Sequence, residues 1–424
     1  MQPSLRRVAA AAALAIATFA SSTGALAAGA DPVLLEAARA AQPAVVQSLK
    51  DMVSIESGSA NAAGLAQMAS YTEKRLKALG ASVERVAVTK GPGTMIKGTF
   101  TGTGTRRIML IAHMDTVYPA NTLTTQPIHQ EGNRLYGPGI ADDKSGIAVI
   151  LHALEILKNK GWHDYARITV LFNPDEEVGS VGSGETIAAL AGQHDVVLSC
   201  EPTGARDAMG ANGDFLLLGA SGTAMATMQV KGRSAHAGLN PELGRNALVE
   251  LAYQIQQTRD LAKQVPGTQM SWTEAGTGGT RNKIPESAFA NADVRLLTTT
   301  ASVEQLKVAL QDKVDSSRLV PDTQTTITVK ALRPAFVATA GGRAMAKHAQ
   351  EIYAELDGRP LGLLDKTGGG TDAGYAGRSG KAAVVESWGL AGFGAHARDE
   401  YVELDSIVPR LYLMTRMLED LGRN

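Results

Sequence analysis

Two kinds of apolar segment alternate along this chain. One has apolar residues at helical spacing, and the other is a continuous apolar run typical of buried strands. Apolar positions at helical spacing occur at residues 33–49, 64–79 and 145–158. Continuous apolar runs of strand length occur at residues 107–112, 166–172 and 195–200. Strands that are covered on both faces give such runs, because neither face meets water. The pattern predicts an α/β fold with a largely parallel mixed sheet flanked by helices.

A different pattern begins near residue 221, where strands alternate apolar and polar positions. Such strands are predicted at residues 223–231, 269–274, 289–297 and 323–332, and helices at 244–262 and 302–314. The order strand, helix, strand, strand, helix, strand is typical of a small α+β sandwich. The first pattern returns at residues 341–356, 382–386 and 406–421. We therefore predict one domain in two parts, 28–220 and 334–424, with a lid domain, 221–333, inserted into it.

The N-terminus has a pattern of its own. Arg6 and Arg7 precede an apolar run at residues 8–19, and small residues follow up to Ala27. This order predicts a secretory signal peptide at residues 1–27, and hence export to the periplasm. A membrane anchor is the alternative, but the run is shorter than the roughly 20 residues that a spanning helix needs. The arginine pair does not decide between the general and the twin-arginine export routes.

Composition excludes several classes of protein. The chain has 424 residues, of which 44% are hydrophobic, and a formal net charge of -1. Binding to nucleic acid or to an anionic membrane would need a basic excess or cluster, so we expect neither partner. Cys200 is the only cysteine, so no intrachain disulfide can form. Stability must then rest on a core large enough for two domains.

Imidazole and carboxylate side chains follow the predicted strands or open a predicted helix. They are His113, Asp142, Glu177, Glu201 and His396. Ligands of α/β sheets bind beyond the carboxyl ends of the strands, so we expect these side chains to meet. Two histidines and three carboxylates suit a pair of divalent ions such as zinc. If Asp142 bridges the ions, each has three protein ligands and an open position, which is typical of a catalytic site.

Each of these residues alone also has an ordinary structural explanation. The pair Asp142 and Asp143 precedes a predicted helix, where an aspartate is commonly an N-cap. A histidine at a strand end commonly caps a loop. The combination on one edge of one sheet favours metal binding instead. We assign structural roles to the other histidines, which we expect to lack acidic neighbours: His129, His152, His163, His194 and His348.

Several motifs together resemble a known family. They are His113-x-Asp115, Gly137-Pro-Gly-x-Ala-Asp-Asp-Lys144, Asp175-Glu-Glu-x-Gly179, Glu201-Pro202, Ser234-Ala-His-Ala-Gly238, Gly368-Gly-Gly-Thr-Asp372 and His396. They look like the M20 family of dizinc metallopeptidases, and within it the carboxypeptidase G2 type of glutamate carboxypeptidase. The resemblance runs over nearly the whole chain. It implies a zinc-exopeptidase fold, two Zn²⁺ per subunit, hydrolysis of an amide bond, and a homodimer formed through the lid domain.

The same resemblance implies roles for individual residues. Asp142 bridges the two zinc ions; His113 and Glu201 bind one of them, and Glu177 and His396 bind the other. Glu176 is the general base. Asp115 orients the imidazole of His113, and the peptide bond after Asp142 is cis. His236 reaches the active site of the partner subunit, where it donates a hydrogen bond to the developing oxyanion.

The resemblance also implies substrate contacts, of which Arg295 binds the α-carboxylate through two parallel hydrogen bonds. Further contacts are Asn282, Arg333, Gly369, Gly370 and Thr371. Relatives that release glutamate carry a lysine just before the lid, whereas the corresponding run here is Phe215-Leu-Leu-Leu218. Burying a substrate carboxylate without a cation is costly. We therefore expect a preference for an apolar or aromatic C-terminal residue. Release of glutamate is the alternative if Arg333 takes the place of the missing lysine.

Taken together, the sequence predicts an exported dizinc metallocarboxypeptidase or amidohydrolase that removes the C-terminal amino acid from peptides or N-acyl amino acids. An M20 aminopeptidase or dipeptidase, which would recognise a free amine, is one alternative. A non-catalytic periplasmic protein that binds metal or peptide is another. It is disfavoured because Glu176 and all five ligands are present.

Overall fold

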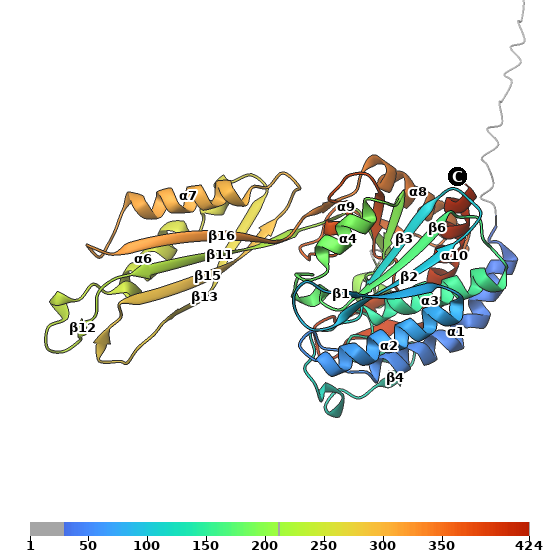
Figure 1. The fold of residues 1–424 in the computed structure, drawn as a ribbon, viewed down its shortest axis with the longest axis horizontal. Coiled ribbons are helices and arrows are strands. Elements are labelled where there is room, and N and C mark those ends of the chain that lie inside the picture. The colour runs from blue at the N-terminus through green and yellow to red at the C-terminus, as the bar shows by residue number, and fades with distance from the viewer. Residues whose placement is uncertain (1–28, 211–212, 424) are drawn as a thin grey trace, which may run out of the picture.

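The computed structural model describes residues 29–210 and 213–423, which form two bodies joined by a narrow neck (Figure 1). The smaller body, called the lid, comprises residues 222–333, and the larger body contains the segments on either side of it. The predicted signal peptide, residues 1–27, lies outside the described residues. None of the described helices is both long enough and apolar enough to cross a lipid bilayer.

The larger body is built on an eight-stranded sheet with the order β1-β2-β6-β3-β7-β19-β9-β18. Its strands are β1 (Ser82–Ala87), β2 (Thr94–Thr101), β3 (Arg107–His113), β6 (Arg167–Asn173), β7 (Val196–Ser199), β9 (Phe215–Leu217), β18 (Gly362–Leu364) and β19 (Ala383–Glu386). The central strands β6, β3, β7 and β19 are mutually parallel, whereas β1 and β2 are antiparallel to their neighbours. The predicted α/β class with a largely parallel mixed sheet is therefore confirmed.

Helices cover both faces of this sheet. The chain runs from β3 through α3 (Lys144–Asn159) to β6, and then through α4 (Gly184–Ala191) back across β3 to β7. Because crossovers between parallel strands are right-handed, these opposite directions place α3 and α4 on opposite faces. The remaining helices of the larger body are α1 (Pro32–Val53), α2 (Ala62–Leu79), α5 (Arg206–Met209), α8 (Ala340–Ala354), α9 (Ala373–Gly377) and α10 (Ile407–Arg423).

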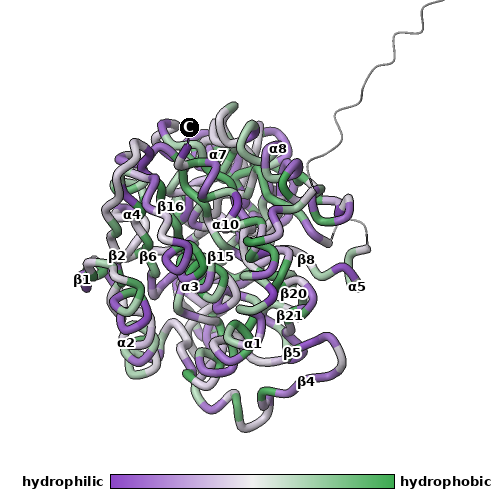
Figure 2. The backbone as a smooth tube through the Cα atoms, turned by 90° about the vertical axis from the view of Figure 1, so that its right-hand side faces the viewer, coloured by the Kyte–Doolittle hydropathy of each residue, from purple (hydrophilic) through white to green (hydrophobic). Residues whose placement is uncertain are grey.

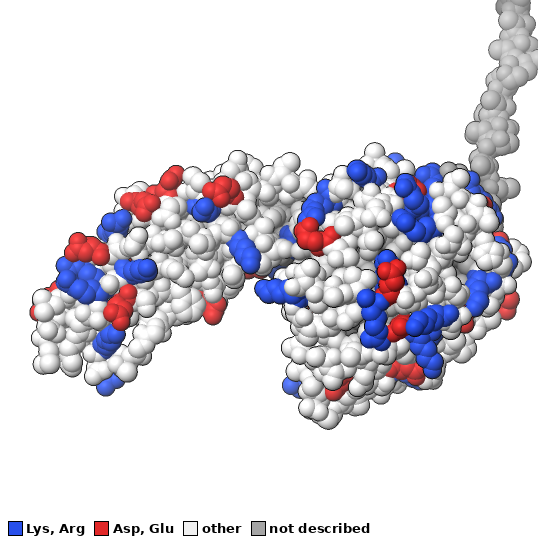
Figure 3. All heavy atoms as spheres, viewed as in Figure 1, with Lys and Arg blue, Asp and Glu red and all other residues white. Residues whose placement is uncertain are grey.

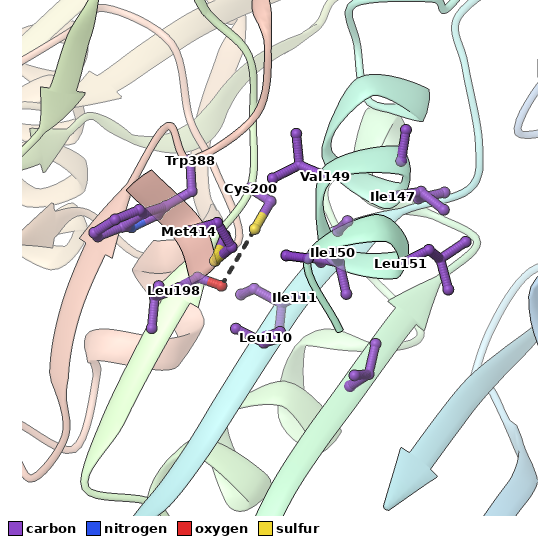
Figure 4. Packing of buried hydrophobic residues seen from close by; sticks show 14 of the residues in the cluster. Leu110, Ile111, Ile147, Val149, Ile150, Leu151, Leu198, Cys200, Trp388 and Met414 are labelled. Carbon is purple, nitrogen blue, oxygen red and sulfur yellow. Dashed lines mark hydrogen bonds between the residues drawn. The ribbon is translucent and has the colours of Figure 1, made fainter. Parts of the chain in front are cut away.

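Part of the core of the larger body lies between α3 and the central strands (Figure 4). Ile147 and Ile150 of α3 are fully buried together with Leu110 and Leu198 of β3 and β7. Cys200 is buried in the same cluster, where its thiol lies 3.7 Å from the carbonyl oxygen of Leu198. Burial of each such aliphatic side chain contributes about 1.5–3 kcal/mol to folding. The strand ends that carry the polar residues are therefore fixed by a dense core.

A second sheet of five short strands, with the order β4-β5-β21-β20-β8, differs from the sequence prediction, which did not include it. Its strands are β4 (His129–Glu131), β5 (Arg134–Tyr136), β8 (Thr203–Gly204), β20 (Ala391–Phe393) and β21 (Tyr401–Glu403). Strands of two or three residues are too short to show an alternating pattern. Figure 2 shows β4, β5, β20 and β21 together in the lower part of the larger body. The loops that carry Asp142 and His396 leave this sheet.

The lid contains a four-stranded antiparallel sheet with the order β13-β15-β11-β16. Its elements are β11 (Gly222–Lys231), β13 (Thr268–Thr277), β15 (Ser287–Leu296), β16 (Gln324–Arg333), α6 (Ala247–Thr258) and α7 (Val303–Ser316). As predicted, β15 alternates, since Ala290, Ala292 and Val294 are buried in a core that the lid forms by itself. Helix α6 ends earlier than predicted, and a 3-10 turn (Leu261–Gln264) follows it. Charges of both signs lie interspersed on the face shown in Figure 3.

Candidate metal centre

Five side chains from distant parts of the chain meet beyond the carboxyl ends of the central strands. Donor atoms of His113, Asp142 and Glu201 lie within 4.8 Å of one another, and so do those of Asp142, Glu177 and His396. Asp142 belongs to both groups. Its Oδ1 lies 2.9 Å from His113 Nε2, and its Oδ2 lies 3.4 Å from His396 Nε2. The two oxygens of Asp142 therefore face different groups, which is the arrangement that a ligand shared by two ions needs.

Asp115 holds the imidazole of His113 in one orientation. Nδ1 of His113 lies 3.0 Å from the backbone carbonyl oxygen of Asp115 and 3.3 Å from its Oδ1. In the neutral ring Nδ1 therefore carries the proton, and Nε2 presents its lone pair to Asp142 and Glu201. Both His113 and Asp115 are buried, so no water competes for this orientation.

Four of the five residues are also held through their backbone N–H groups, each of which donates to a buried carboxylate. The pairs are His113 to Asp143 at 3.2 Å, Asp142 to Glu400 at 3.0 Å, Glu177 to Asp115 at 3.1 Å, and Glu201 to Glu386 at 3.2 Å. All four accepting side chains are buried. Acceptors of this kind orient the groups that bind a metal and raise its affinity. We call them the carboxylate frame.

Glu400 makes further contacts besides that with the N–H of Asp142. The N–H groups of Gly139 and Ala141 also donate to its carboxylate, at 2.9 and 2.8 Å. The hydroxyl of Tyr118 lies 2.7 Å from Glu400 Oε2 and 2.7 Å from the carbonyl oxygen of Ala397. Glu400 therefore links the loop before α3 to the segment after β20. Sequence reasoning missed it, because an acidic residue at the start of a short strand is too common a signal.

The two adjacent aspartates of the loop before α3 have different surroundings. The peptide bond between Asp142 and Asp143 is cis, as the resemblance implies. Asp143 Oδ1 accepts a hydrogen bond from the N–H of Gly146 at 3.1 Å and so caps α3. Its Oδ2 belongs to the carboxylate frame. Asp142 faces the candidate metal positions, whereas Asp143 supports the fold around them.

Glu176 lies next to the metal groups, against a buried arginine. Arg333 Nη1 lies 2.7 Å from Glu176 Oε1, and Arg333 also donates to the backbone carbonyl of Glu176. The backbone N–H of Glu176 donates to Asp115 Oδ1 at 3.0 Å. Burial raises the pKa of Glu176 to about 8, although the charge of Arg333 opposes this. Arg333 is the last residue of β16, so this pair connects the junction of the lid to Glu176.

The charges of the five residues fit a pair of divalent cations. Burial raises the pKa values of Glu177 and Glu201, and the charge of Asp142 raises them further. Hydrogen bonds to Asp142 and Glu177 raise the pKa of His396 to about 10. Among residues 29–210 and 213–423, no lysine or arginine forms an ion pair with the three carboxylates. One ion in each group would supply the missing positive charge, and zinc accepts this set of nitrogen and oxygen donors.

A cleft of about 790 Å³ opens beside these residues, between the larger body and the lid. Arg295 lines it from the lid. Its guanidinium group pairs with Asp293 at 2.8 Å and donates to the carbonyl oxygen of Gly368 at 3.2 Å. Arg333 lines the cleft as well, together with the expected contacts of the glycine-rich loop: Gly369, Gly370 and Thr371. The structure thus brings most of the predicted substrate contacts to one cleft.

Part of the lining of this cleft is apolar. It is formed by Met209, Phe215, Leu217 and Leu364. Strands β9 and β18 are adjacent and parallel, and Leu217 pairs with Leu364. Lys366 lines the same cleft just after β18. Sequence reasoning missed Lys366, because the pairing of β9 with β18 joins segments that lie far apart in the chain.

His236 and Asn282 do not line the cleft of their own chain. Both lie at the far end of the lid, where β12 (Ala235–His236) pairs with β14 (Lys283–Ile284) (Figure 1). His236 is exposed, and its Nδ1 accepts hydrogen bonds from the N–H groups of Gly238 and Leu239, both at 3.1 Å. In the neutral ring the proton is therefore on Nε2, which makes no hydrogen bond within residues 29–210 and 213–423.

The expectation that the remaining histidines lack acidic neighbours is wrong. His348 lies 2.8 Å from Asp420, and His152 lies 3.1 Å from Glu155. Glu155 lies three residues after His152 on the same helix, and Asp420 reaches His348 from the distant helix α10. The sequence prediction included neither contact. In the described part of the chain, neither histidine joins a group of three candidate metal donors.

Comparison with known proteins decides the family. Residues 109–420 match the peptidase family M20/M25/M40. This chain belongs to the M20 family. It is 43% identical to carboxypeptidase G2 of Pseudomonas sp. (strain RS-16) over 427 residues, which cover 100% of this chain and 99% of that protein. The predicted family and enzyme class are therefore confirmed: the chain is a metal-dependent hydrolase, an M20 metallocarboxypeptidase of the carboxypeptidase G2 type.

More distant relatives are also similar to this chain. A succinyl-diaminopimelate desuccinylase of Gluconobacter oxydans (strain 621H) is 29% identical, over 74% of this chain and 81% of that protein. The structure of an M20 family metallo-carboxypeptidase from Sulfolobus solfataricus matches with a TM-score of 0.74 at 16% identity. That match covers 90% of this chain and 99% of the other. At this identity it supports the M20 fold alone.

Proposed function

We propose that this protein is an exported dizinc carboxypeptidase or amidohydrolase that releases the C-terminal amino acid of peptides or N-acyl amino acids. The observation that carries the proposal is the pair of donor groups that share Asp142, beside the buried Glu176. His113 and Glu201 would hold one ion, Glu177 and His396 the other. Two bound zinc ions supply Lewis acidity, which lowers the pKa of a water and polarises a carbonyl group.

The side chains around this centre bind the substrate and move the proton. Arg295 binds the substrate α-carboxylate in the cleft, a task that suits a guanidinium group. Glu176 takes a proton from the attacking water and returns it to the leaving amine. Its raised pKa, about 8, suits a group that must hold a proton between these two steps. Arg333 keeps the carboxylate of Glu176 in one position.

The amino acid released is apolar or aromatic in this proposal. The cleft offers an apolar surface of Phe215, Leu217 and Leu364 to the departing side chain. Arg333 is buried and paired with Glu176, whereas the side chain of Arg295 is partly exposed to the cleft, so Arg333 does not compensate for the missing lysine. Lys366 favours a second candidate, the release of glutamate, because its ammonium group lies in the same cleft. Substrate comparison separates the two candidates.

A homodimer formed through the lid is part of the proposal. His236 and Asn282 lie at the far end of the lid, away from the cleft of their own chain. In a dimer, the partner subunit's His236 donates from Nε2 to the oxyanion that develops on the substrate. Export to the periplasm rests on the pattern of residues 1–27.

Hydrolysis by the purified mature protein tests this function. N-acyl amino acids with a blocked amine should be cleaved, activity should disappear on chelation, and zinc should restore it. Cleavage only of peptides with a free amine would indicate an aminopeptidase or dipeptidase instead. Zinc binding without hydrolysis of either class would indicate a binding protein.

A further inference from the structure

A second hollow, of about 660 Å³, adjoins the cleft at the metal centre. Glu177 and Val178 line both spaces. The rest of the hollow is lined by the loops at residues 58–61 and 116–120, and no lid residue contributes to it. The two spaces therefore meet at Glu177, one of the candidate metal ligands.

The position of Arg295 implies that the two spaces bind different parts of the substrate. If Arg295 holds the substrate α-carboxylate, the amino acid to be released fills the cleft. The amide bond to be cleaved then lies at the metal centre, and the acyl side of the substrate continues beyond it. The hollow beside Glu177 is the space that adjoins the centre there, and its volume suits a group of small-ligand size.

Three polar side chains that line the hollow, those of Ser59, Asn61 and Tyr118, are already engaged in hydrogen bonds within the protein. The hydroxyl of Ser59 donates to Asp115 Oδ2 at 2.7 Å. Asn61 caps α2, since its Oδ1 accepts from the N–H of Gly64 while its Nδ2 donates to the carbonyl of Glu56. The hydroxyl of Tyr118 contacts Glu400 and Ala397, as described above. These groups are therefore not available to a polar ligand.

Apolar side chains form the accessible part of the hollow. Val117, Pro119, Ala120 and Val178 are all exposed at its surface. None of the lining residues is a lysine, arginine or histidine, and the one carboxylate among them is that of Glu177. A negatively charged group placed here would lose hydration without gaining a cationic partner, which is costly. An apolar group would bury these side chains and gain free energy.

We propose that this hollow is the acyl subsite, which takes neutral apolar or aromatic acyl groups and rejects acyl groups that carry a carboxylate. The inference rests on the proposed function, because it assumes that the amide is cleaved between the two spaces. It assigns the selectivity for the acyl group to Val117, Pro119, Ala120 and Val178.

The first test compares N-benzoyl and N-succinyl derivatives of whichever amino acid the zinc-loaded enzyme releases fastest. The subsite predicts that kcat/KM for the benzoyl substrate exceeds that for the succinyl substrate by about 100-fold or more. A ratio below about 10-fold would overturn the proposal.

A cation placed in the hollow should change this ratio. Val117→Lys and, separately, Ala120→Lys each introduce an ammonium group from the loop at residues 116–120. Each should raise kcat/KM for the succinyl substrate by about 10-fold or more relative to the benzoyl substrate. Val181→Lys is the matched control, because Val181 is 41% exposed, as is Val117, but does not line the hollow. If neither lining variant changes the ratio, or if the control changes it equally, the proposal is wrong.

A binding measurement separates failure of the subsite from failure of the proposed function. Calorimetry on zinc-loaded Glu176→Gln protein gives the Kd of each derivative without turnover. If neither derivative is hydrolysed by the wild-type enzyme, the proposed function fails. In that case a Kd at least about 10-fold lower for the benzoyl derivative would still support the subsite, and equal or reversed values would overturn it.

Discussion

The backbone N–H of Asp142 donates to Oε1 of Glu400 at 3.0 Å. Glu400 is buried and lies 258 residues further along the chain. The residue that both donor groups share is thus held through its backbone by the carboxylate of Glu400. Through Tyr118, Glu400 also adjoins the segment that follows His396. The geometry of the centre therefore depends on residues that would not touch the ions.

Replacing Glu400 with glutamine should weaken zinc binding. The amide keeps one acceptor oxygen. Its NH₂ group replaces either Oε1, which accepts the N–H groups of Ala141 and Asp142, or Oε2, which accepts the N–H of Gly139 and the hydroxyl of Tyr118. We expect the zinc dissociation constant to rise about 10–100-fold, measured by competition with a chelator. Glu250→Gln is a matched control, because Glu250 is buried in the lid and accepts the N–H groups of Leu319 and Val320. Wild-type zinc affinity in Glu400→Gln would refute this role.

Glu176→Gln should separate metal binding from proton transfer. Glutamine preserves the contact with Arg333 but cannot accept a proton from the attacking water. Zinc content should remain at the wild-type value while kcat falls about 10²–10⁴-fold. Glu177→Gln provides the contrast, since it removes a proposed ligand and should lower the zinc content as well. Turnover near the wild-type rate in Glu176→Gln would show that Glu176 is not the general base.

The apolar surface of the cleft predicts selectivity for the amino acid released. The ratio of kcat/KM for N-acyl-phenylalanine to that for N-acyl-glutamate should be at least about 10, because the glutamate carboxylate would be buried beside Phe215. Phe215→Lys should shift this ratio toward glutamate by about 10–100-fold. A wild-type preference for glutamate that Lys366→Met abolishes would contradict the apolar assignment and support pairing with Lys366.

Complementation between two inactive variants tests whether His236 acts in the partner subunit. His236→Ala alone should lower kcat about 10²–10³-fold, as loss of an oxyanion donor does. A heterodimer of His236→Ala with Glu176→Gln, obtained by co-expression and purified with two affinity tags, should recover about half of the wild-type activity. One of its sites then has both an intact Glu176 and the partner subunit's His236. If His236 acts within its own chain, the heterodimer stays inactive.

Acid should destabilise the protein through buried neutral histidines. Burial lowers the pKa of His194 to about 4, and its ring is held between the carbonyl of Leu190 and the hydroxyl of Thr169. Between about pH 6.5 and 4, the unfolded chain binds a proton that the native state does not. This contribution to stability is complete above pH 6.5 and is lost as the pH falls toward 4.

Denaturant unfolding of the metal-free protein measures this effect. The wild-type free energy of unfolding should fall by about 1.4 kcal/mol per pH unit more steeply than that of His194→Gln across this interval. The difference between the two proteins isolates His194 from the titrating carboxylates. Identical slopes would show that His194 does not titrate as its burial implies.

Much of the fold could be predicted from sequence because its core strands are continuous apolar runs. The lid strand β15 was equally clear, since every second residue from Ala290 to Val294 is buried. The five-stranded second sheet could not be predicted, because its strands are two or three residues long and pair across distant segments. Local patterns report what one strand buries, but not which strand lies beside it.

The same limit applies to the candidate centre. The five metal-binding candidates follow strand ends or open a helix, and such positions can be read along the chain. Glu400 and Glu386 were not found, because each acts on a residue at least 185 positions away. Lys366 was missed for a related reason, since it enters the cleft through the pairing of β9 with β18. Residues that support a site from a distance carry no local pattern.

The zinc content of Asp142→Ala tests the central claim most directly. The wild-type chain should bind two zinc ions, measured by mass spectrometry after dialysis against metal-free buffer. Because one oxygen of Asp142 faces each donor group, its removal should abolish both ions together. A variant that keeps one zinc ion at full occupancy would contradict the shared-ligand account.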